Sequence, residues 1–249
     1  AALPFLSRKK AEFGIGIARI QDRYFQTNII DFSQAKHDRS TYDILGGSIV
    51  LEGSTLNARQ FATQGSREKM AAQIFTGREK FKAGNPQAPV ENQYKKIQSW
   101  LQVSYENETY HKISPKFTLG AYLEAYYSSR NFSNNYTATL MEAGEFAPTA
   151  HSKVTYNEAF RANQYTGIGA IPIYQLGNSI QLRGEFYGFI PIFPIKKDEY
   201  GKAYYGKAFT KFEYLGEISL VFQLSFGSIS AYVNHYSSPN NDWNVGLTL

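Results

Sequence analysis

Hydrophobic and polar residues alternate with a period of two along much of this chain. In the segment 218–226, Ile, Leu and Phe occupy every second position, and Ser or Gln stands at most positions between them. The segments 117–126, 180–192 and 243–249 repeat the alternation, and their other phase carries Arg, Glu, Gln, Asn and Tyr. Because successive side chains of a β-strand point to opposite faces of a sheet, the pattern predicts strands with one apolar and one polar face.

The alternation predicts an all-β fold of about ten strands. No amphipathic helix of useful length is indicated, and we expect one domain over residues 1–249. The strands are expected near residues 12–21, 42–53, 67–77, 95–106, 117–129, 164–176, 179–193, 212–225, 228–237 and 242–249.

The connections between the expected strands sort by position. The short ones at 176–178 and around Gly227 fall at one end of the sheet. The other end receives the tight turn 238–241 and the long connections 22–41, 78–94, 130–163 and 194–211. Long loops at one end and mostly short turns at the other are typical of outer-membrane barrels. We therefore predict a transmembrane antiparallel β-barrel in a bacterial outer membrane, with the C-terminus on the short-turn, periplasmic side.

Composition agrees with a barrel but leaves an alternative. Aromatic residues make up 16% of the chain, with 19 Tyr and 18 Phe, and charged residues 19%. This aromatic excess fits either interfacial girdles of a barrel or a soluble β-rich protein that binds carbohydrate or protein. The mean hydropathy is −0.40, and no run approaches the roughly 20 apolar residues of a helical span, whereas a spanning strand needs only about ten.

Charge and cysteine content exclude several classes of function. The net charge of +5 is scattered along the chain, which argues against nucleic-acid binding, because that function needs a concentrated basic stripe. The chain has no cysteine, which excludes thiolate metal sites and cysteine nucleophiles. Near the N-terminus apolar residues precede basic ones, the reverse of a signal peptide. We therefore expect either that a signal has been removed or that the chain begins inside a longer protein.

No catalytic motif is recognisable. Gly46-Gly47-Ser48 is the nearest match to a nucleophile elbow, but no glycine follows at the required position. None of the six aspartates precedes a glycine, as the catalytic aspartate of some serine hydrolases commonly does. The histidines are widely spaced and are expected to be solvated loop or interface residues; they are His37, His111, His151 and His235. We predict no enzymatic activity and no cofactor or metal.

Two segments carry a resemblance to a known family. Residues 54–65 (STLNARQFATQG) resemble the periplasmic turn of the BamA-type outer-membrane superfamily, in which Leu-Asn/Asp-x-Arg precedes an aromatic residue, Pro-Thr and Gly. The matching residues are Leu56, Asn57, Arg59, Phe61, Thr63 and Gly65, while Ala62 stands in place of the proline. The segment Ala159-Phe160-Arg161-Ala162-Asn163 is similar to the loop-six motif of that family, and about five expected strands follow it, as in the family.

The resemblance implies that Arg161, following Phe160, folds into the lumen on the long loop 130–163. There it could pair with Glu185 or Glu217, both of which lie on the polar phase of later strands. Glu185 has an alternative partner in Arg183 on its own strand.

The likeness spans the whole chain and is closest to barrels that follow a patatin-like phospholipase domain. It is carried by Tyr24-Phe25, Ile30-Asp31-Phe32, Gly77-Arg78-Glu79-Lys80-Phe81 and Gly84-Asn85. The family barrel has sixteen strands, so this chain is expected to supply its C-terminal part.

The resemblance implies a membrane anchor or translocation domain for a patatin-like protein. The partners are then outer-membrane lipid or lipopolysaccharide and an attached or associated periplasmic or surface domain. A BamA-type insertase or translocase and a soluble β-rich binding protein are the alternatives.

Overall fold

One antiparallel sheet accounts for most of the structure. The computed structural model describes residues 2–6, 9–25, 36–84, 93–224, 227–238 and 243–248. The 11-stranded sheet has the order β1-β2-β3-β4-β5-β6-β9-β10-β13-β14-β15. Its strands are β1 (Ala2–Leu6), β2 (Lys9–Tyr24), β3 (Asp38–Ser54), β4 (Gly65–Lys82), β5 (Gln93–Lys112), β6 (Phe117–Ser128), β9 (Gln164–Gln175), β10 (Ile180–Pro191), β13 (Glu213–Leu224), β14 (Gly227–Tyr236) and β15 (Trp243–Thr248).

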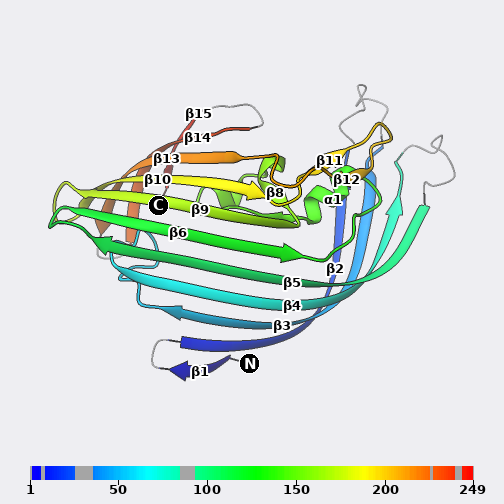
Figure 1. Cartoon of the computed structure of the whole chain (residues 1–249), viewed down its shortest axis with the longest axis horizontal. Coiled ribbons are helices and arrows are strands. Elements are labelled where there is room, and N and C mark those ends of the chain that lie inside the picture. The colour runs from blue at the N-terminus through cyan, green and yellow to red at the C-terminus, as the bar shows by residue number, and fades with distance from the viewer. Residues whose placement is uncertain are drawn as a thin grey trace.

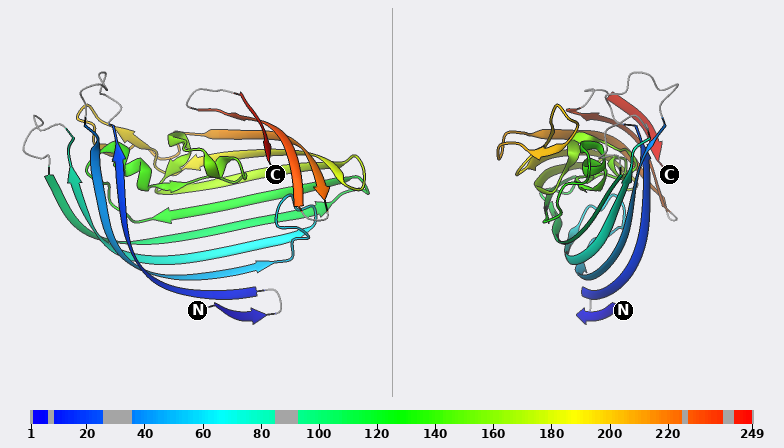
Figure 2. Two further views of the ribbon diagram at one scale, coloured as in Figure 1. Left: turned by 180° about the vertical axis from the view of Figure 1, so that it is seen from behind. Right: turned by 90° about the vertical axis from the view of Figure 1, so that its right-hand side faces the viewer.

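The sheet curls into a deep trough rather than a closed cylinder. Each strand pairs with the next one of the sheet along the chain, and the strands bend round a common axis (Figures 1 and 2). The two edge strands are β1 and β15, and they do not pair with each other within the described residues. The predicted all-β antiparallel fold is therefore confirmed. The described strands do not close into a cylinder, and the sequence predicted that this chain supplies only part of a barrel.

The expected strands correspond to strands of the 11-stranded sheet, with two differences. The short strand β1 was not expected, and β2 to β5 are longer than the alternation indicated. For example, β5 has 20 residues, whereas the alternation marked only 95–106. Strand pairing continues beyond the apolar alternation because the ladder uses backbone groups, and its ends carry polar side chains on both faces.

The strand bounds confirm the predicted sorting of the connections. Those between β2 and β3, β4 and β5, β6 and β9, and β10 and β13 meet at one end, called here the long-loop end. The connections 55–64, 113–116 and 176–179 lie at the other, called here the turn end.

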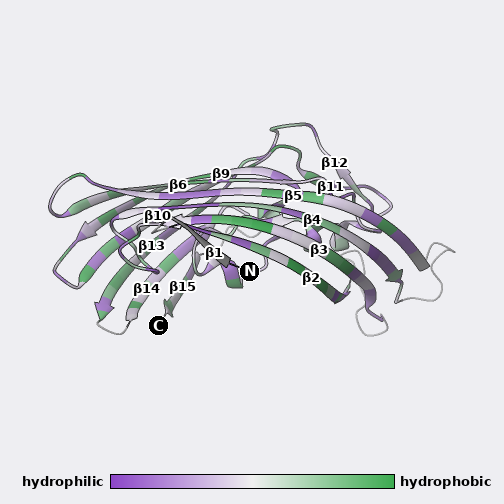
Figure 3. Cartoon of the chain, turned by 90° about the horizontal axis from the view of Figure 1, so that it is seen from below, coloured by the Kyte–Doolittle hydropathy of each residue, from purple (hydrophilic) through white to green (hydrophobic). Residues whose placement is uncertain are grey.

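The two faces of the trough differ in chemistry. Figure 3 shows hydrophobic and hydrophilic residues alternating along the strands. The convex face carries exposed apolar side chains on every long strand, among them Ile15, Ile17, Leu45, Ile49, Ile74, Leu101, Leu119, Ile168, Phe186, Ile218 and Val245. The predicted apolar residues Phe226 and Leu249 lie outside the described residues. Among the described residues no helix is long and apolar enough to cross a membrane.

The connection between β6 and β9 folds back over the concave face. It contains α1 (Tyr136–Glu142), two 3₁₀ turns (Ser152–Val154 and Glu158–Phe160) and the short paired strands β7 (Gly144–Glu145) and β8 (Arg161–Ala162). A smaller hairpin of β11 (Ile195–Lys197) and β12 (Ala203–Tyr205) lies near α1 at the long-loop end (Figure 1). Residues 129–163 are called the inner loop below.

Candidate functional site

The inner loop has a folded structure of its own. Asn135 caps α1 by accepting a hydrogen bond from the Ala138 backbone N–H at 2.9 Å, which satisfies one of the free donors of the first turn. The β7–β8 pairing ties the two arms of the loop together. Leu140 and Ala162 are almost completely buried, so the loop packs as a unit and is not a flexible excursion.

Polar contacts attach the start of the inner loop to the long strands. Asn135 Nδ2 donates to the Tyr24 hydroxyl of β2 at 2.8 Å, and the Tyr42 hydroxyl of β3 donates to Ser133 Oγ at 3.1 Å. All four side chains are buried. Since a buried polar group is costly without a partner, these bonds fix where the loop meets the sheet.

Arg130 is a second attachment at the long-loop end. Its guanidinium forms a buried ion pair with Glu142 at the end of α1. The same group lies 5.0 Å from the ring centre of Tyr42 and 4.7 Å from that of Trp100, within the range of cation–π attraction. No sequence motif identified Arg130, because its partners come from segments far apart in the chain.

Aromatic side chains of the inner loop fill the space above the later strands. Phe146 stacks on Phe189 of β10 with ring centres 5.6 Å apart, and Phe160 lies 5.8 Å from Tyr236 of β14. The space for Phe146 depends on Gly167 of β9, where an added Cβ would lie 2.0 Å from Phe146 Cε2. The loop therefore occupies this part of the concave face as a close-packed plug.

Arg161 stabilises the inner loop itself and does not reach the sheet. Its guanidinium donates to carbonyl oxygens at the end of α1, with Met141 O at 3.0 Å, and pairs with Glu145 of β7 at 2.9 Å. The prediction that Arg161 pairs with Glu185 or Glu217 is wrong. Carbonyl groups at the C-terminal end of a helix lack intrahelical partners and attract a nearby cation. Those of α1 are closer to Arg161 along the chain than either glutamate is.

Glu217 is instead the partner of a histidine from the inner loop. His151 Nδ1 lies 2.9 Å from the Glu217 carboxylate, and its Nε2 lies 2.5 Å from Thr248 Oγ1 of β15. The imidazole also stacks on Tyr232 with ring centres 3.4 Å apart. His151 and Glu217 are buried, so the expectation of a solvated loop histidine is wrong at this position. The contact joins the loop to β13, β14 and β15.

Arg183 and Glu185 form the ion pair that was the alternative to Arg161. Arg183 also donates to Ala62 O at 2.8 Å and to the Tyr110 hydroxyl at 2.6 Å, and both members of the pair are buried. Ala62 belongs to the connection 55–64, so this turn folds inward under the concave face. Sequence periodicity assigned the face of Arg183 but could not show which distant groups meet it.

Residues of the segment 54–65, which the sequence analysis singled out, hold that connection in shape. Asn57 Oδ1 accepts from the backbone N–H of Thr63 at 2.9 Å and from that of Gln64 at 3.1 Å. Gly65 has a φ of 90°, a conformation that favours glycine, and Phe61 is buried. Leu56 packs on the same aromatic cluster as Phe160. Arg59 is exposed and makes no hydrogen bond or ion pair with the described residues.

The two segments singled out in the sequence therefore meet in one cluster. Leu56 and Ala62 of the turn and Phe160 of the inner loop pack with residues of β5 to β14. Over β5 to β14 the concave surface is covered from the long-loop end by the inner loop and from the turn end by residues 55–64.

No protein-family model matches the chain, and no curated protein matches it. Among the described residues no group of three or more His, Asp and Glu side chains could hold a metal ion. The features of the molecule that bear on function are the two faces of the sheet and the covered part of the concave side.

Proposed function

We propose that this chain is the membrane-spanning β-barrel portion of a bacterial outer-membrane protein and serves as a membrane anchor. The proposal rests on the different chemistry of the two faces. Exposed apolar side chains form a band across the convex face between the two ends of the strands, whereas the charged side chains at that level lie on the concave face, paired or hydrogen-bonded. On the convex face Ile15 is 90% exposed, Ile17 85% and Val245 82%. A soluble protein rarely exposes so continuous an apolar surface, whereas a lipid-facing barrel wall requires it.

A membrane-spanning role requires hydrogen-bond partners for the backbone groups of the edge strands β1 and β15. In lipid, each unpaired backbone N–H or C=O group costs on the order of several kcal/mol. Sheets that span a membrane therefore close into barrels, so that no edge strand stays unpaired. Strands outside the described sheet would pair with β1 and β15. The sixteen-stranded barrel implied by the BamA-type resemblance would supply them.

The covered concave face favours an anchor over an open passage. Phe146, Phe160 and the buried Arg183–Glu185 pair occupy the region through which a substrate would pass. Translocation would require the inner loop to leave, which breaks the His151–Glu217 contact. The attached domain is expected to be patatin-like on the resemblance alone, and a BamA-type insertase is the alternative on the same basis.

A lipid-quenching experiment tests the proposal directly. The chain has no cysteine, so single cysteines can be placed at Ile49 on the convex face and at Ser48 on the concave face of the same strand, β3, where neither side chain is buried. Each carries an environment-sensitive fluorophore in protein reconstituted with brominated lipid. We expect strong quenching at position 49 and little at 48.

Adjacent positions provide the control, because they share depth, strand and labelling chemistry. Equal quenching at both positions, or protein that stays monomeric in buffer without detergent, would favour the soluble β-rich binding protein. A native protein with periplasmic repeats in place of a hydrolase domain would favour the insertase.

A further inference from the structure

Basic side chains form rows across the convex face at the long-loop end of β2 to β5. Strand register places Arg23 of β2 opposite Arg39 of β3, and Arg39 opposite Lys82 of β4. In the next row Lys80 stands opposite Lys95 of β5. All five side chains belong to exposed residues on the convex phase of their strands.

A third row holds the only convex-face acid of this region among the described residues. Asp43 of β3 stands between Arg19 of β2 and Arg78 of β4. It pairs with Arg19 and with Lys80, the latter at 3.0 Å. These rows are called the basic rows below; they comprise Arg19, Arg23, Arg39, Arg78, Lys80, Lys82 and Lys95, with Asp43 as the acid.

The charge of the basic rows is not balanced within the described structure. Arg39, Arg78, Lys82 and Lys95 make no ion pair with any described residue. Like charges directly opposite one another in a sheet repel. An external anion between the strands would remove this repulsion, and the row of Arg23, Arg39 and Lys82 offers it three cations.

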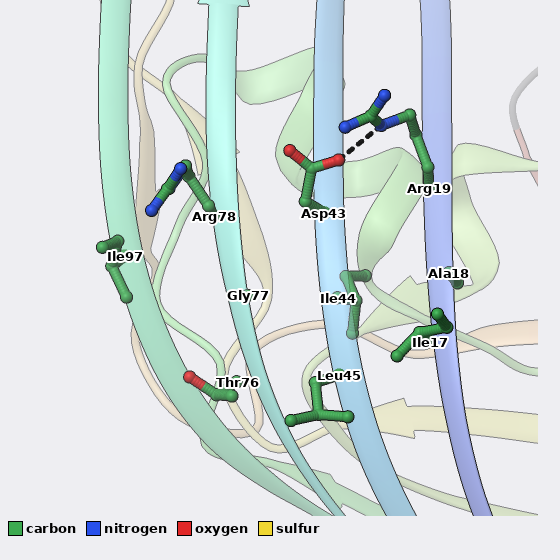
Figure 4. Close-up of a pocket in the computed structure, with 10 residues that line it drawn as sticks. All are labelled: Ile17, Ala18, Arg19, Asp43, Ile44, Leu45, Thr76, Gly77, Arg78 and Ile97. Atoms are coloured by element: carbon green, nitrogen blue, oxygen red, sulfur yellow. Dashed lines mark hydrogen bonds and ion pairs between the residues drawn. The ribbon is translucent and has the colours of Figure 1, made fainter.

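An apolar surface begins immediately below the basic rows. Figure 4 shows Arg19, Asp43 and Arg78 on neighbouring strands, with Ile17, Leu45 and Ile97 beside them. Together they line an open depression on the convex face. The ligand that fits this border has an anionic head and a hydrocarbon body.

We infer that the basic rows bind the phosphate groups of a phosphorylated lipid, with its acyl chains lying along the apolar surface below. The inference rests on the proposed membrane-spanning role, which makes the long-loop end the headgroup level of one leaflet. Arginine suits this task because its guanidinium can contact phosphate through two hydrogen bonds. The apolar half of the site distinguishes the ligand from nucleic acid or an acidic peptide.

The test is a binding titration of bis-phosphorylated lipid A into the full protein in a phosphate-free detergent. The variant carries Arg39→Gln, Arg78→Gln and Lys82→Gln together. Each cation near a charged lipid surface contributes about fivefold in affinity, so the triple variant should bind roughly a hundredfold more weakly. Dephosphorylated lipid A should bind the wild type similarly weakly, and inorganic phosphate alone should bind weakly because it lacks acyl chains.

A matched control removes the same charge at the turn end, through Lys9→Gln, Lys112→Gln and Lys116→Gln, and should bind like the wild type. A second variant, Arg39→Lys with Arg78→Lys, should retain most of the binding and shows that the region still folds. Binding of the triple Gln variant within twofold of the wild type, or equal binding of dephosphorylated lipid, would overturn the inference. If lipid quenching at position 49 also fails, the membrane role falls as well; if it succeeds, only the phosphate site is wrong.

Discussion

The concave face has two regions, which stabilise their charged side chains in different ways. Near the turn end of β2 to β5 it carries a ladder of ion pairs: Lys10 bridges to Glu52 at 3.1 Å, and Arg67 bridges to Glu52 at 2.9 Å and to Glu106 at 2.8 Å. Their side chains are between 21% and 49% exposed. Over β6 to β14 the corresponding face is covered by the inner loop, and Arg183 is only 4% exposed.

The difference shows that a polar inner face needs either water or a complete set of partners. In the exposed ladder, solvent screens the charges and each ion pair contributes little. In the covered region every ionised group must find a protein partner, because an isolated buried charge is very costly. The inner loop and the turn 55–64 supply those partners, through His151 for Glu217 and Ala62 for Arg183.

Removing one arginine from each region gives the largest expected contrast. Arg183→Met leaves Glu185 buried without its cation and should lower the free energy of unfolding by about 3–5 kcal/mol. Arg67→Met in the exposed ladder should cost about 1 kcal/mol or less. Reversible urea unfolding in lipid vesicles measures both. Similar losses would show that the two regions do not differ in effective burial.

On the convex face, unlike the concave face, the same substitution should have a similar effect in β2 to β5 and in β6 to β14. Ile74→Arg on β4 and Leu220→Arg on β13 each place a charge among apolar neighbours and should cost about 2–4 kcal/mol near the bilayer midplane. Gln223→Arg, on the concave phase of β13, should be tolerated. The same unfolding assay applies. Equal tolerance of all three changes would remove the assignment of the lipid face.

A pair of glycines probes the packing of the two regions with the same small change. A Cβ at Gly167 collides with Phe146 of the inner loop, so Gly167→Ala should cost about 1–3 kcal/mol through overpacking. Gly16 of β2 has open space around its Cβ position, and Gly16→Ala should be neutral or stabilising by up to about 1 kcal/mol. Thermal unfolding in detergent checks both. A costly Gly16→Ala would mean that the exposed region is packed against something further.

The sequence predicted the strands well because their alternation is local. The faces of Glu185, Glu217 and Arg183 followed from a period of two, and the ends of the sheet followed from connection lengths. Closure of the sheet into a barrel could not be read from the same signal, since it depends on which edges meet and not on any residue pattern.

The contacts of the inner loop could not be predicted from the sequence, for a different reason. Arg161 satisfies carbonyls released by α1, a helix too short to leave a periodic signal. His151 looked isolated because Glu217 and Thr248 are distant in the chain, and Arg130 has no motif around it. Such partners are selected by three-dimensional proximity inside a covered space. A buried position for His151 had no sequence indicator that we can name.

The smallest expected effect concerns the line of Glu217, His151 and Thr248, whose order of carboxylate, imidazole and hydroxyl is that of a hydrolase relay. We expect this line to be structural. Its imidazole is buried and stacked on Tyr232, which keeps a substrate away from it. With Glu217 ionised and the imidazole neutral, Nδ1 donates to the carboxylate and Nε2 accepts from the hydroxyl, an order that a structural and a catalytic line share. Thr248→Val should therefore cost only about 0.5–1.5 kcal/mol in unfolding free energy, the value of one hydrogen bond. The protein should show no turnover of a short-chain ester before or after the change, with an upstream hydrolase domain, if one is attached, inactivated at its own serine. Saturable turnover that disappears in both Thr248→Val and His151→Ala, while the folded fraction of each variant stays at the wild-type level, would make the line catalytic. The covered region would then be a site that opens, because a substrate could reach Thr248 only if the inner loop moved away from β15.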